Sequence, residues 1–94
     1  MATYLMFGKY SLDSLGKISP SRTKSATAVI AENGGALKGG YALLGDKDIV
    51  LIAEFPSTDK AMKASVTLAK LLGIGFTTAP AVTLEEFDKL IKGK

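Results

Sequence analysis

Asp46 and Asp48 flank Lys47 and form the densest group of charged residues beside a predicted strand. Two carboxylates next to an amine can bind a cation or orient a polar ligand. Asp48 is the stronger candidate of the two, because it stands where the following strand begins. The same residues also suit a simple turn, since aspartate is a common turn former and Gly45 tolerates positive φ. Both interpretations remain open from the sequence.

Arg22 is the only arginine of the chain and follows Ser19-Pro20, a pattern typical of a helix start. The free N–H groups of a helix start favour an anion, and the guanidinium adds a planar fork that suits a carboxylate or phosphate. Alternatively, Ser19 is an ordinary N-cap and Arg22 is solvated.

Tyr4 and Tyr41 are candidate ligand contacts because a tyrosine hydroxyl in an apolar pocket needs a hydrogen-bond partner. Together with Tyr10, Phe55 and Phe76 they would line a pocket between a sheet and its helices. The alternative is that these aromatic residues belong to the hydrophobic core, where aromatic side chains contribute most of the burial.

The chain contains neither histidine nor cysteine. It therefore lacks the commonest general base near neutral pH, any thiolate nucleophile, and the two side chains that most often bind transition metals. We expect no cofactor and no metal site. We also expect no nucleic-acid partner, because the net charge is only +3 and the basic residues are almost all lysines.

The length of 94 residues corresponds to one domain, 1–94, with no room for a second independent core. No stretch approaches the roughly 20 apolar residues that a membrane-spanning helix requires. The N-terminus lacks the basic region and apolar run of a signal peptide. A cytoplasmic protein without a membrane partner is the expectation.

Periodicity and turn residues predict the order β-α-β-β-α-β with an added C-terminal helix. The predicted strands and helices are Tyr4–Tyr10, a helix from Ser19-Pro20 to Gly34-Gly35, Ala36–Leu44, Ile49–Phe55, a helix from Ser57 or Thr58 to Gly73, Ile74–Ala81 and Leu84–Ile91. This is the order of the α+β ferredoxin-like fold, which has a four-stranded antiparallel sheet with two helices on one face.

Ile49–Phe55 does not alternate between polar and apolar residues, as a strand with one solvent-exposed face normally does. A second copy of the chain packed on the open face of the sheet would explain this pattern. The rival explanation is a central strand that tolerates apolar residues on both sides, covered by the C-terminal helix.

Short motifs in a fixed order along nearly the whole chain resemble the GYD-domain family. The motifs are Tyr4-Leu5-Met6, Ser19-Pro20-Ser21-Arg22, Gly34-Gly35, the turn from Tyr41 to Asp48, Thr78 and Glu85-Glu86-Phe87. The resemblance implies a dimeric α/β barrel, in which two ferredoxin-like domains pack sheet against sheet, and implies no particular activity. Gly45 and Asp48 match the Gly-x-Tyr-Asp signature. Lys47 replaces its tyrosine, and Phe76 stands where the family has a basic residue.

We therefore expect a homodimer, possibly a higher oligomer, that binds a small, partly apolar molecule between sheet and helices. Asp48, Asp46, Arg22, Tyr4 and Tyr41 are the candidate ligand contacts. The alternative is a non-catalytic module for oligomerisation or effector sensing. The sequence places no acid and base together, so we assign no catalytic residue and leave open whether the protein is an enzyme.

Overall fold

The computed structural model describes residues 1–16 and 19–93, which form one four-stranded sheet and its helices. The elements in chain order are β1 (Ala2–Tyr10), α1 (Leu12–Leu15), α2 (Pro20–Glu32), β2 (Ala36–Ala42), β3 (Ile49–Phe55), α3 (Thr58–Leu72), β4 (Ile74–Ala81) and α4 (Leu84–Lys92).

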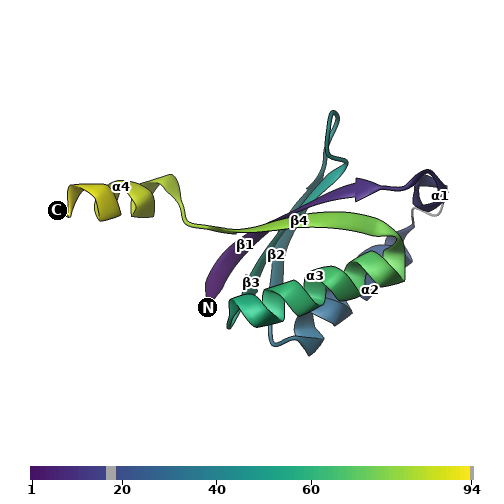
Figure 1. Cartoon of the computed structure of the whole chain (residues 1–94), viewed down its shortest axis with the longest axis horizontal. Coiled ribbons are helices and arrows are strands. Elements are labelled where there is room, and N and C mark those ends of the chain that lie inside the picture. Colours follow the sequence, from purple (N-terminus) through teal and green to yellow (C-terminus); the bar gives the residue numbers. More distant parts are fainter. Residues whose placement is uncertain (17–18, 94) are drawn as a thin grey trace.

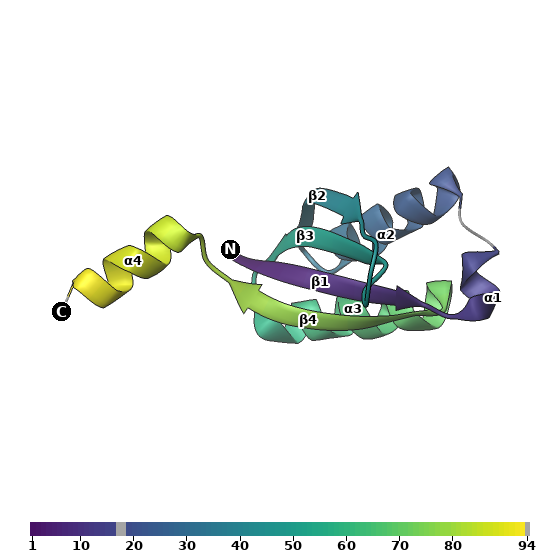
Figure 2. The same ribbon diagram turned by 90° about the horizontal axis from the view of Figure 1, so that it is seen from above.

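The strands are antiparallel and lie in the order β2-β3-β1-β4, with α2 and α3 together on one face (Figures 1 and 2). This arrangement confirms the predicted α+β ferredoxin-like fold. β3 and β1 occupy the centre, where each has a partner on both sides. β4 is an edge strand, and Pro80 is tolerated there, because an edge position does not require its missing N–H for the ladder.

The two long helices on this face end as the glycines predict. Gly34, with a φ of 77°, follows α2, and the N–H of Gly35 bonds to the carbonyl of Ile30 at 3.0 Å. These are features of the Schellman motif, in which a left-handed residue lets the chain turn back over the last carbonyls. Gly73 ends α3 in the same left-handed region, with a φ of 68°.

The helix starts follow the predicted positions with one difference in chemistry. Ser57 caps α3 by accepting the N–H of Lys60, and Thr83 forms the predicted capping box with Glu86. Ser19 is the N-cap of α2, but its hydroxyl makes no capping hydrogen bond.

β2 is shorter than predicted, because it ends at Ala42 instead of Leu44. Leu43 still donates a backbone hydrogen bond to the carbonyl of Asp48, but Leu44 is fully exposed at the tip of the hairpin. The apolar character of Leu44 therefore gave a wrong strand end. The bulge predicted near Gly39-Gly40 is present as a register shift between Leu37 and Gly39.

The core lies between the sheet and the two helices. Its largest fully buried side chains are Phe55 and Met6 from the sheet, and Ile30 and Leu68 from the helices. Alternate residues of each strand face this core, so their sequence neighbours must face the other side of the sheet.

The other face of the sheet carries no helix, and we call it the open face (Figure 2). Its central residues are Leu5 and Phe7 of β1, paired across the strands with Ile52 and Val50 of β3. β3 is therefore apolar on both sides, as the sequence indicates. Val50 is almost buried on this face, although it takes no part in the helix-side core.

The last helix, α4, projects away from the sheet and does not cover the open face of its own chain (Figures 1 and 2). None of its residues is buried. The structure therefore does not support the rival explanation, in which the C-terminal helix covers β3 within one chain. Among the described residues, no helix is both long and apolar enough to cross a membrane.

Candidate functional site

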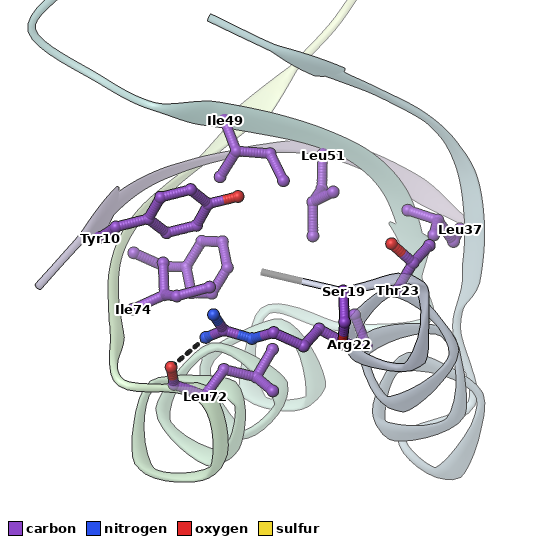
Figure 3. A pocket seen from close by; sticks show the side chains of 11 residues that line it. Tyr10, Ser19, Arg22, Thr23, Leu37, Ile49, Leu51, Leu72 and Ile74 are labelled. Carbon is purple, nitrogen blue, oxygen red and sulfur yellow. Dashed lines mark hydrogen bonds between the residues drawn. The ribbon is translucent and has the colours of Figure 1, made fainter. Parts of the chain in front are cut away.

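A cavity of about 80 Å³ lies between the sheet and the N-terminal half of α2 (Figure 3). Strands and helices both contribute to its mostly apolar wall, which consists of Ala26, Leu37, Ile49, Leu51, Leu72, Ile74 and Phe76. The polar residues that reach it are Tyr10, Ser19, Arg22 and Thr23. A concave apolar site with a few convergent polar groups is the usual form of a small-molecule site.

Arg22 is half-buried and joins the two helices at the cavity. Its Nη2 donates a hydrogen bond to the carbonyl of Leu72, the last residue of α3 (Figure 3). The last carbonyls of a helix have no partner within the helix, so a guanidinium from a neighbouring helix is a suitable donor. The guanidinium carbon also lies 5.8 Å from the ring centre of Tyr10, within the range of a cation–π contact.

Tyr10 is the last residue of β1, and its side chain reaches toward the cavity, with the hydroxyl directed inward (Figure 3). Within residues 1–16 and 19–93, no group hydrogen-bonds to this hydroxyl. Its backbone N–H donates to the Oδ2 atom of Asp48 at 2.8 Å. The carboxylate of Asp48 therefore fixes the end of the strand that carries Tyr10.

Asp48 joins the hairpin to the centre of the sheet. Its N–H donates to the carbonyl of Gly8 at 2.9 Å, and its carbonyl accepts the N–H of Leu43 at 2.8 Å. With the bond to the N–H of Tyr10, the residue makes one side-chain and two backbone hydrogen bonds. These bonds give a structural reason for aspartate at the end of the Gly-x-Tyr-Asp signature.

The structure does not bring the five predicted contact residues together, because only Arg22 lines the cavity. Asp46 is exposed in the hairpin turn. Tyr41 lies opposite Val50, which places it on the open face, where 66% of it is exposed. Tyr4 is buried in the core, and its hydroxyl bonds to the Oγ1 atom of Thr58 at 2.9 Å.

Several cavity residues were absent from the predicted contacts, although the alternation of the strands indicates some of them. Ile49 and Leu51 point to the same side as the core residue Ala53, and Ile74 and Phe76 alternate in the same way on β4. Thr23 and Leu72 could not be found in this way, because their proximity depends on how α2 and α3 pack.

A second, polar groove of about 440 Å³ adjoins the cavity and shares Ser19, Arg22 and Leu72 with it. Asp13 and Lys70 are the charged residues that it adds, and Ser11, Ser21, Leu71 and Gly73 complete its lining. The hydroxyls of Ser19 and Ser21 are 2.8 Å apart at this groove. Arg22 therefore stands at the boundary between an apolar chamber and a polar opening.

The described part of the cavity wall contains no aspartate, glutamate or lysine. Among residues 1–16 and 19–93, no group of three or more acidic residues is placed to hold a metal ion. The arrangement can hold a molecule and hydrogen-bond to it through Arg22 and Tyr10. It does not present a carboxylate that could act as a general base next to such a molecule.

The model of the GYD domain matches residues 4–91. This chain belongs to the GYD-domain family. The match includes the hairpin turn with Asp48 and the Arg22 segment, the two parts of the chain that build one end of the cavity. A search of the curated proteins finds no match.

Among solved structures, the GYD-domain chain is similar to the leucine response regulatory protein LrpA of Mycobacterium tuberculosis. The TM-score is 0.57 at 10% sequence identity, and the likeness covers 87% of this chain. It covers 51% of the regulator, so the GYD-domain chain corresponds to about half of that protein. At this identity the likeness shows a shared fold alone.

Asp48→Ala removes the acceptor for the N–H of Tyr10, so we expect the free energy of unfolding to fall by about 1–2 kcal/mol. Asp48→Asn is the matched control, because its amide oxygen can still accept this hydrogen bond. Urea denaturation measures both. Equal stability of Asp48→Ala and the wild type would show that the bond does not hold the hairpin to β1.

Gly8 lies beneath the cavity wall. A Cβ atom there would meet Ile49 at 2.7 Å, Ile74 at 2.9 Å and Phe76 at 3.0 Å. Because all three side chains line the cavity, Gly8→Ala must displace part of its wall, and we expect a loss of about 1–3 kcal/mol in unfolding free energy. Gly39→Ala is the control, since nothing lies within 4 Å of its Cβ position. Equal effects of the two variants in thermal unfolding would contradict the close packing at Gly8.

Proposed function

We propose that this GYD-domain protein is a homodimer that binds a small, partly apolar molecule in the cavity between sheet and helices. The observation that carries the proposal is the hydroxyl of Tyr10, which enters an apolar chamber beside Arg22 without a hydrogen-bond partner among the described residues. A polar group in such a place costs free energy unless a partner satisfies it. A bound molecule with a polar end supplies that partner.

The surface area of the chain supports a partner subunit. A compact monomer of this mass exposes about 5,200 Å², whereas this chain exposes 6289 Å². The excess of about 1,100 Å² is comparable to the roughly 800 Å² that each partner loses in a stable interface. The proposed occupant of this surface is a second copy of the chain.

The open face supplies the apolar centre of the proposed interface. Leu5, Phe7 and Ile52 lie side by side there, and Val50 completes the group. Two such faces stacked about 10 Å apart would bury these side chains between the sheets. The α4 helix, with Leu84, Phe87, Leu90 and Ile91 exposed, adds apolar surface that its own chain does not cover.

A second candidate function is a non-catalytic module that senses an effector. The likeness to LrpA favours it, because that protein is a leucine response regulator. The absence of acidic side chains and lysines from the described cavity wall also suits a binding site more than a catalytic one. Both candidates require a cavity ligand, and an enzyme would convert the ligand where a sensor only binds it.

The cavity can be tested with 3-methyl-1-butanol, a small branched alcohol, followed by methyl NMR. We expect shifts at Ile49, Leu51 and Ile74, which line the cavity, and none at Leu90 or Ile91 of α4. Ala26→Leu should abolish the shifts, because it adds an isopropyl group to the wall. Shifts at no methyl, or equally at all of them, would refute binding in the cavity.

The dimer can be tested with Ile52→Lys, which places a charge at the centre of the open face. Burying this charge without a partner should raise the dissociation constant of the dimer at least about 100-fold. Met62→Lys is the control, since Met62 is an exposed residue of α3, a helix on the opposite face of the sheet. Light scattering during size-exclusion chromatography measures both, and a wild-type monomer at micromolar concentration would overturn the dimer.

A further inference from the structure

We infer that the ligand of the cavity is a short-chain aliphatic monocarboxylate, with its carboxylate at Arg22 and its hydrocarbon tail inside. This inference rests on the proposed function, since it names the chemical class that the same cavity would select. It follows from three features of the site: where its charge lies, how large the apolar chamber is, and which donors converge at the boundary.

Arg22 alone brings a formal charge to the described wall of the cavity. Its guanidinium is held in place by the carbonyl of Leu72 and the ring of Tyr10. A planar guanidinium presents its N–H donors in a fork whose geometry matches a carboxylate, and less conformational freedom is lost when the fork is already positioned. A neutral or cationic ligand end would gain no such interaction.

The charges around the boundary favour a single negative charge on the ligand. Arg22 and Lys70 contribute two positive charges to the polar groove, and Asp13 contributes one negative charge. The sum over these described side chains is +1. A monoanion balances this sum, whereas the second charge of a dicarboxylate or a phosphate ester would lie in the same groove as Asp13.

The chamber volume limits the tail. The cavity of about 80 Å³ is roughly half of the 150 Å³ that accepts benzene in an engineered protein cavity. A branched tail of about four carbon atoms therefore fits better than an aromatic ring. Isoleucine and leucine side chains form much of the wall, and no charged side chain other than Arg22 reaches the described lining.

Tyr10 completes the recognition of the carboxylate. Its hydroxyl points into the chamber, and its ring lies beside the guanidinium of Arg22 (Figure 3). A carboxylate at the boundary can accept from this hydroxyl as well as from the guanidinium. The carboxylate of Asp48 holds the backbone at Tyr10, so Asp48 acts as a positioning residue that does not line the cavity.

The experiment compares ligands of matched shape on the wild-type protein: 3-methylbutanoate, 3-methyl-1-butanol, 3-methylbutylamine, leucine and succinate. NMR titration gives each dissociation constant. A hydrogen-bonded charge pair should make 3-methylbutanoate about 10- to 100-fold tighter than the alcohol. The amine and succinate should bind more weakly than 3-methylbutanoate.

Two variants assign this preference to residues. Arg22→Met keeps an unbranched stem without charge, so the preference for 3-methylbutanoate over the alcohol should disappear while the alcohol still binds. Tyr10→Phe keeps the ring and the contact with Arg22, and should weaken 3-methylbutanoate about 3- to 10-fold, leaving the alcohol affected less. The second variant serves if Arg22→Met fails to fold.

The outcomes separate this inference from the proposed function. If the alcohol and 3-methylbutanoate bind equally well in the wild type, the monocarboxylate is wrong but the cavity still binds a small molecule. If neither binds, the proposed function fails as well. Tighter binding of succinate overturns the single charge. Binding of leucine as tight as that of 3-methylbutanoate supports the carboxylate and extends the ligand class to amino acids.

Discussion

Covering both faces of a sheet with helices on only one of them is the constraint on which this structure depends. Because both crossover helices, α2 and α3, pack on the same face, the central strands β1 and β3 must satisfy two different environments at once. On the helix side their side chains form the core and the wall of the cavity. On the open side Leu5, Phe7, Val50 and Ile52 present apolar surface that their own chain leaves uncovered.

Most of the fold could be predicted from local signals whose physical cause lies within a few residues. The caps at Ser57 and Thr83 and the glycine at Gly73 fix helix ends through hydrogen bonds and backbone conformation that any chain with these residues would adopt. The end of β2 could not be predicted in this way. The strand ends at Ala42, although Leu43 and Leu44 have strand-like residue types, because the hairpin turn withdraws them from the ladder.

The site was predictable only in part, because its residues meet through packing. Arg22 stood out as a lone arginine at a helix start, but its contact with Leu72 depends on the approach of α2 to α3. Asp48 stood out through its position in the turn. Its observed contacts are the backbone groups of Gly8, Tyr10 and Leu43, which lie far from it in sequence or across the hairpin. Residue types thus indicated which side chains were unusual, and the packing determined what they touch.

The alternation of β3 has a thermodynamic consequence. Leu51 contributes to the cavity wall, while its neighbours Val50 and Ile52 lie on the opposite, open face, so one rigid strand borders both. A displacement of the strand by one occupant is transmitted to the other face without any intervening side chain. If the two surfaces are both used for binding, their affinities are linked, and the linkage is reciprocal: a ligand that tightens association must itself bind more tightly to the associated form.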